Sequence, residues 1–139
     1  MESDHVTAPH PTKGFWVEQL LRQGGWPVTP ANRVALAAWI HGEGCVAAWN
    51  PLATTRPYVG AVKWNTSGVM SYATFADGIH ATLDTLRLGY YSKVTAALLH
   101  GTDSAQIAAA VVASPWGTNV LNISYAITNL AVLEAAVMP

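Results

Sequence analysis

The chain has 139 residues, of which 51% are hydrophobic and 11% are charged, and its formal net charge is −1. This length suits one domain with a single core, and the composition excludes a disordered chain. The charge is nearly zero and no cluster of lysine or arginine occurs, so neither nucleic acid nor an anionic membrane is an expected partner.

The first residues are polar and carry two prolines. We expect residues 1–13 to form a loose arm, because Pro9 and Pro11 disfavour regular structure, and residues 14–139 to form the folded domain. The arm is acidic and has no apolar stretch, which predicts that no signal peptide is present.

Two helices are predicted next. Apolar residues at helical spacing favour a helix over 14–23. The second should span 30–43, because Thr29 can cap its start, Pro30 suits the first helical position and Gly44 suits its end.

A short hairpin should follow the second helix. Residues 58–64 and 68–72 have strand character and flank the turn sequence Asn-Thr-Ser. A helix is then predicted from Thr74 to about Arg87, with Asp77 in a capping-box position.

The last third of the chain reads as helical. Helices are predicted over 90–100 and 104–113, with a turn at 114–119. Residues 120–137 are apolar but are interrupted by polar side chains, which favours a core helix over a membrane span. The predicted class is therefore α+β, mainly α.

Glu43 stands out among the few charges. It shares one face of the second helix with Leu36, Trp39 and Ile40, and it lies at the negative end of the helix dipole. Partial burial and the dipole both favour the neutral acid, which can donate a proton to a leaving oxygen. The simpler interpretation is a helix-end glutamate turned towards water.

No second carboxyl group has a comparable setting. Asp77 suits a helix cap, Asp84 has Arg87 three residues on, and Glu18 can pair with Arg22. A retaining glycosidase normally uses two carboxyl groups. A glycan-cleaving enzyme of this sequence should therefore use one essential acid, with water or the sugar itself completing the reaction.

The loop after Glu43 is rich in groups that bind sugars. Aromatic faces stack on pyranose rings, and amides and hydroxyls bond to ring substituents. The candidates are Trp49, Asn50, Thr54, Thr55, Tyr58, Trp64, Asn65 and Tyr72. Each also has a structural interpretation: Asn50-Pro51 is a turn signal, and Asn65 suits a hairpin turn.

The order of these features resembles the lysozyme-like superfamily of peptidoglycan glycan-strand enzymes. More narrowly, it is similar to the muralytic domains of endolysins and tail proteins of phages that infect actinobacteria. The matching stretches are AWIHGEG (38–44), NPLATT (50–55), NTSGVMSYATFADGIHATLDTL (65–86), YYSKVTAALLHG (90–101) and SPWGTN (114–119). Glucosaminidases of the autolysin and flagellar type share a Y-x-(S/T)-x-x-x-G helix start, which here is Tyr72, Thr74 and Gly78.

The resemblance implies a lysozyme-like fold, with a small β-hairpin beside the catalytic helix, that cleaves β-1,4 bonds between the amino sugars of peptidoglycan. Glu43 would be the general acid, and the Asn65–Tyr72 segment would line the opposite wall of the cleft. The implied substrate-binding residues are Trp49, Asn50, Thr54, Thr55, Asn65 and Tyr72. Two departures leave hydrolysis and transglycosylation both open: GVMS (68–71) stands near the place of the transglycosylase signature G-L-M-Q, and the usual E-S pair is E-G.

The expected partner is thus the bacterial cell wall, with no metal and no cofactor, and phage particle proteins are possible further partners. A phage product without a signal peptide would stay in the host cytoplasm until release, or travel in the virion. An alternative of another class is a non-catalytic wall-binding or virion structural module that keeps the fold. A third alternative is a hydrolase that uses Cys45 as nucleophile, with His41 or His80 as base.

Overall fold

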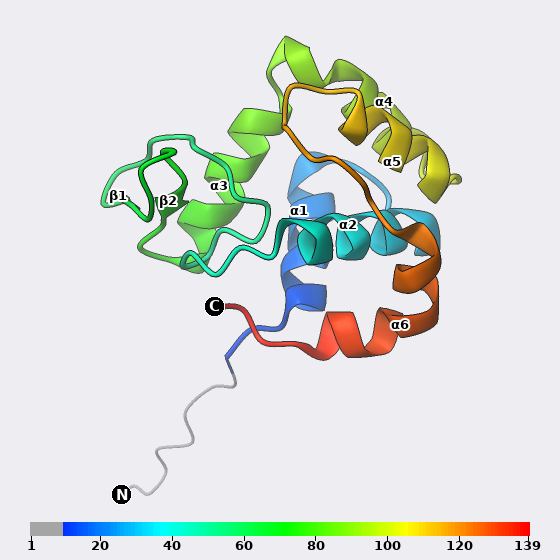
Figure 1. Cartoon of the computed structure of the whole chain (residues 1–139), viewed down its shortest axis with the longest axis horizontal. Coiled ribbons are helices and arrows are strands. Elements are labelled where there is room, and N and C mark those ends of the chain that lie inside the picture. The colour runs from blue at the N-terminus through cyan, green and yellow to red at the C-terminus, as the bar shows by residue number, and fades with distance from the viewer. Residues whose placement is uncertain (1–9) are drawn as a thin grey trace, which may run out of the picture.

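The computed structural model describes residues 10–139, which form a helical body with a small two-stranded sheet at one side (Figure 1). This confirms the predicted α+β, mainly helical class. The elements in chain order are α1 (Lys13–Gly24), α2 (Pro30–Glu43), β1 (Val62–Lys63), β2 (Met70–Ser71), α3 (Phe75–Leu86), the 3-10 turn η1 (Gly89–Tyr91), α4 (Ser92–His100), α5 (Ser104–Val112) and α6 (Ile123–Ala135).

Helix α2 is the central element, and its predicted ends are confirmed to the residue. The Thr29 side chain accepts a hydrogen bond from the Asn32 amide at 3.1 Å, and Pro30 occupies the first helical turn. Gly44 ends the helix with φ 57°, in the left-handed region that favours glycine. All residues from 34 to 40 are buried, and α1, α5 and α6 pack around them. Glu43 is the last residue of α2 and therefore lies where this helix leaves the core.

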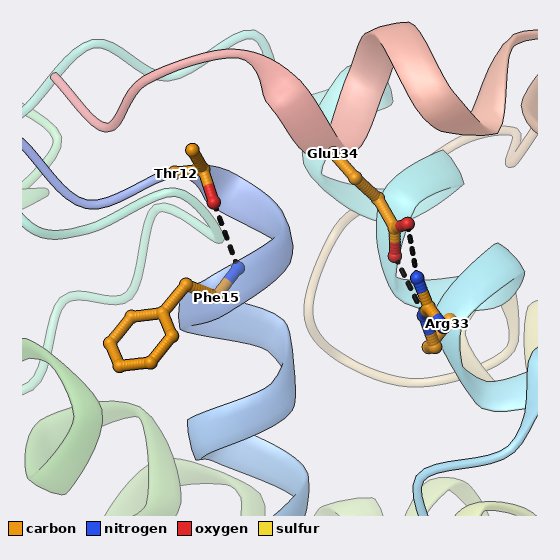
Figure 2. A network of polar contacts seen from close by, with 4 residues as sticks. All are labelled: Thr12, Phe15, Arg33 and Glu134. Carbon is orange, nitrogen blue, oxygen red and sulfur yellow. Dashed lines mark hydrogen bonds and ion pairs between the residues drawn. The ribbon is translucent and has the colours of Figure 1, made fainter.

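The two ends of the described chain are joined. Thr12 caps α1 through the Phe15 amide at 3.1 Å and forms a bridge with Val137. Arg33 on α2 holds Glu134 on α6 with two hydrogen bonds, as Figure 2 shows. The last residues of the predicted loose arm thus belong to the fold, while residues 1–9 lie outside the described part of the chain.

The hairpin is much shorter than predicted. Its register pairs Val62 with Ser71 and Lys63 with Met70, two residues in each strand. The expected strand over 58–64 was wrong in its first half, because those residues form a turn in which the Ala61 amide bonds to the Tyr58 carbonyl at 3.0 Å.

Helix α6 was predicted to be a core helix. In the structure only one side of it packs into the core, so the prediction holds for that side alone. Ala126 is fully buried, whereas Ile127 and Val132 are 60% and 72% exposed. The helix is also kinked at Asn129, whose φ of −113° is not helical. Within residues 10–139 no helix is both long and apolar enough to cross a membrane.

Candidate functional site

Glu43 is partly exposed and its carboxyl group is held from one side. The Thr118 hydroxyl donates a hydrogen bond to Glu43 Oε2 at 2.6 Å. Thr118 comes from the segment between α5 and α6, which crosses back over the end of α2 (Figure 1). Within residues 10–139 no other hydrogen bond to this carboxyl group is found, so Oε2 has a partner there and Oε1 has none.

Trp116 fastens the crossing segment in place. Its Nε1 donates to the Leu52 carbonyl at 2.8 Å. Its ring packs edge-on against Trp39, with ring centroids 4.8 Å apart, and against Tyr91, 5.1 Å apart. Trp39 lies four residues before Glu43, which is about 6 Å along a helix axis. Trp116 therefore sets the position of Thr118 relative to the acid.

Two adjoining hollows have volumes of about 360 and 180 Å³, and Trp116 lines the smaller one. They share five lining residues, and we call them together the Thr55 groove. The groove is lined by Ala53, Thr54, Thr55, Arg56, Pro57, Thr85, Leu88, Tyr90, Tyr91, Pro115 and Trp116. It combines aromatic rings with hydroxyl groups. Glu43 is not among its lining residues, and the link between them is Trp116, which lines the groove and packs against Trp39 on α2. A separate, mainly apolar cavity of about 130 Å³ between α1, α2 and α6 does not include Glu43 among its lining residues.

Asn50 is one of the predicted substrate-binding residues, and the structure places it beneath the surface. It is 0% exposed. Its Nδ2 donates to the carbonyl oxygens of Thr54 at 2.9 Å and Met70 at 2.8 Å, and its Oδ1 accepts from the Thr54 amide at 3.0 Å. Asn50 therefore joins the loop to the hairpin, and a sugar cannot reach its side chain in this structure.

Thr54 and Tyr72 are also buried, each 3% exposed. The Thr54 hydroxyl is 2.7 Å from the Thr85 hydroxyl and accepts from the Arg56 amide at 3.3 Å. The Tyr72 hydroxyl donates to the Arg56 carbonyl at 2.6 Å. Burial raises the pKa of Tyr72 to about 12. Thr54 lines the groove, whereas Tyr72 does not line it and supports its wall through the Arg56 backbone.

The other three predicted residues are more accessible, but they do not converge. Thr55 is exposed and lines both hollows. Trp49 stacks on His10, with ring centroids 4.9 Å apart, and Asn65 Oδ1 accepts from the Val69 amide at 3.0 Å to close the hairpin turn. Neither Trp49 nor Asn65 lines the Thr55 groove. Of the six, only Thr54 and Thr55 reach it.

The Y-x-(S/T)-x-x-x-G pattern has a structural explanation at all three positions. Tyr72 holds the Arg56 backbone, and Thr74 caps α3 by accepting from the Asp77 amide at 3.1 Å. Gly78 lies against the Trp49 carbonyl oxygen, which a Cβ atom would overlap. The pattern therefore joins α3 to the loop that follows Glu43.

Sequence reasoning missed Thr118 and Arg56. Thr118 lies in a segment that was interpreted as a turn, and its partner Glu43 is 75 residues away. Arg56 is a single arginine in a loop. No local pattern marks either residue, although the SPWGTN stretch contributed to the resemblance.

The cysteine alternative gains no support from the geometry. Burial is the main cause that raises the pKa of the Cys45 thiol, which disfavours the thiolate. His41 stacks on Tyr125, with ring centroids 4.6 Å apart, and His80 Nδ1 lies 3.3 Å from the Tyr58 hydroxyl. Neither histidine is hydrogen-bonded to Cys45 in the described chain. In the same part of the chain, no group of three or more His, Cys, Asp or Glu side chains is arranged to hold a metal ion.

Comparisons with known proteins identify no matching family model, no similar curated protein and no similar solved structure.

Proposed function

We propose that the protein cleaves the glycan strands of bacterial peptidoglycan, with Glu43 as general acid. The observation that carries the proposal is the state of this carboxyl group. It lies at the exposed end of a buried helix, and the Thr118 hydroxyl binds one of its oxygens. Trp116, two residues before Thr118, lines a groove of hydroxyls and aromatic rings. The order of sequence motifs that resembles lysozyme-like muralytic domains adds support.

In this mechanism the protonated Glu43 donates its proton to the oxygen of the glycosidic bond as that bond breaks. The sugar that is left with positive charge at its anomeric carbon is captured by water, in hydrolysis, or by its own 6-hydroxyl, in transglycosylation. In either case the proton of the attacking hydroxyl passes to the Glu43 carboxylate, which restores the acid. The Thr118 hydroxyl bond to Oε2 keeps the carboxyl group in one orientation, so that Oε1 presents the proton. Positioning of this kind lowers the barrier because the reacting groups need not be ordered at the moment of reaction.

We propose that the protein acts on the cell wall of a bacterium that a phage infects. It would reach this wall from the host cytoplasm or as part of a virion. The wall itself is then the expected partner, together with phage particle proteins in the second case.

The test compares wild type with Glu43→Gln on purified cell walls. Glutamine keeps the shape of the side chain but is not an acid. Glu18→Gln is the matched control, because Glu18 lies on the outer side of α1 in an exposed pair with Arg22. Wild type and Glu18→Gln should reduce the turbidity of the suspension and release new saccharide ends, whereas Glu43→Gln should do neither.

The same experiment separates the alternative, a non-catalytic wall-binding module. Such a module would sediment with the walls in all three forms and clear none of them. Equal clearing by wild type and Glu43→Gln would also remove the proposed mechanism.

A further inference from the structure

Within residues 10–139, a single charged side chain lines the Thr55 groove, and its charge is positive. Arg56 is the charged residue among the side chains that line it, and no aspartate or glutamate is among them. The ion pairs found within residues 10–139 join Arg22 to Glu18 and Arg33 to Glu134, and neither involves Arg56. A guanidinium group in such a setting attracts an anionic ligand group.

The backbone of Arg56 is held from both sides. Its amide donates to the Thr54 hydroxyl at 3.3 Å, and its carbonyl accepts from the buried Tyr72 hydroxyl at 2.6 Å. Thr54 is itself bonded to Thr85 on α3. Hydrogen bonds to the backbone are not required to keep an arginine side chain exposed to solvent. A fixed backbone does reduce the conformational freedom that is lost when the side chain grips a ligand.

The neighbours of Arg56 suit a sugar that carries the anionic group. Tyr90 is 73% exposed and lines the same hollow as Leu88 and Thr55. An aromatic ring and an aliphatic side chain match the apolar face of a pyranose, and the hydroxyl can bond to its substituents. The volume of about 360 Å³ is within the range of small-ligand sites.

We propose that Arg56 binds a carboxylate of the substrate glycan, so that the Thr55 groove selects the acid-bearing sugar of the strand over the neutral one. The planar guanidinium can hold a carboxylate with two parallel hydrogen bonds. This inference rests on the proposed function. In peptidoglycan the carboxylate has two sources: the lactyl group of the muramyl sugar, where it is free, or the peptide attached to it.

The test measures binding to three glycan probes by calorimetry, in the full chain with Glu43→Gln to prevent turnover. The probes are a neutral chitin tetrasaccharide, a peptide-free tetrasaccharide with lactyl carboxylates, and the same tetrasaccharide with peptides attached. Arg56→Gln is introduced into this background. Lys63→Gln is the matched control, because it removes one positive charge from the exposed strand β1, outside the groove.

We expect at least one acidic probe to bind about tenfold or more tightly than the neutral probe. Arg56→Gln should abolish that preference, Lys63→Gln should keep it, and the preference should weaken in high salt. The acidic probe that shows the preference identifies the source of the carboxylate.

Two outcomes overturn the inference alone: equal affinity for neutral and acidic probes, or a preference that survives Arg56→Gln. If none of the three glycans binds, the proposed function fails and the inference fails with it. Circular dichroism of each variant verifies that the substitutions leave the fold intact.

Discussion

Replacing Asn50 with alanine should destabilise the protein by about 2–4 kcal/mol. The side chain is fully buried and makes three hydrogen bonds to the backbone, two to Thr54 and one to Met70, at 2.8–3.0 Å. Each bond of this kind contributes about 0.5–1.5 kcal/mol, and its loss leaves a backbone group unpaired in the interior. The loss should appear as a lower midpoint of urea unfolding with an unchanged slope.

A matched substitution sharpens the measurement. Asn65→Ala also removes an amide from the same region, but it loses one bond, to the Val69 amide, at a less buried site. It should cost no more than about 1.5 kcal/mol. If Asn50→Ala unfolds at the wild-type midpoint and loses glycan cleavage all the same, Asn50 contacts the substrate and the positioning role derived from its burial is incorrect.

Three further predictions follow from the contacts around the site. Thr118→Val should lower kcat about tenfold or more, because the Glu43 carboxyl group loses the hydrogen bond that orients it towards the substrate. Thr118→Ser should restore most of kcat, and equal rates for the two variants would refute this role. Because the pKa of Tyr72 is raised to about 12, the unfolded chain loses its phenol proton first, so the free energy of unfolding should fall between about pH 10 and pH 12. Tyr72→Phe should flatten that fall, and an unchanged slope would contradict it. Gly78→Ala should destabilise the protein by more than about 2 kcal/mol, because the added methyl group overlaps the Trp49 carbonyl. A stable Gly78→Ala protein, measured by urea unfolding, would show that the two segments can separate at low cost.

The helix boundaries that the sequence predicts well are those with local chemical signals. Thr29, Pro30 and Gly44 determine both ends of α2, and Thr74 determines the start of α3. Each signal acts over three or four residues, so it needs no knowledge of the rest of the chain. The place of Glu43 at the end of a buried helix follows from the same signals.

The hairpin and α6 were predicted less well because their extent depends on packing. Residues 58–61 look like a strand, but Gly60 has φ 80° and turns the chain there. The apolar residues of α6 outnumber the positions that α1 and α2 can cover, so Ile127 and Val132 stay exposed. Composition alone does not show how many neighbours an apolar helix will have.

Sequence reasoning predicted the position of Glu43 at the end of α2 but not the hydrogen-bond partners of the residues around it. Sequence reasoning assigned sugar contacts to Asn50, Thr54 and Tyr72 from their side-chain chemistry. In the structure the same polar groups make hydrogen bonds within the protein that hold the loop after α2 in place. The partners that make the site, Thr118 for Glu43 and the hydroxyl network for Arg56, join segments distant in sequence. Such contacts leave no periodic or short-range pattern to detect.

The most direct test of the central claim is mass spectrometry of the soluble products released from purified peptidoglycan by wild type and by Glu43→Gln. Wild type should yield glycan fragments with new saccharide ends, either reducing or 1,6-anhydro. Glu43→Gln should yield them at least about a hundredfold more slowly, because general acid catalysis contributes about 10² to 10⁴ in rate. Intact glycan strands after wild-type treatment, or the same fragments from both proteins at the same rate, would contradict the assignment of Glu43 as the acid that cleaves the strand.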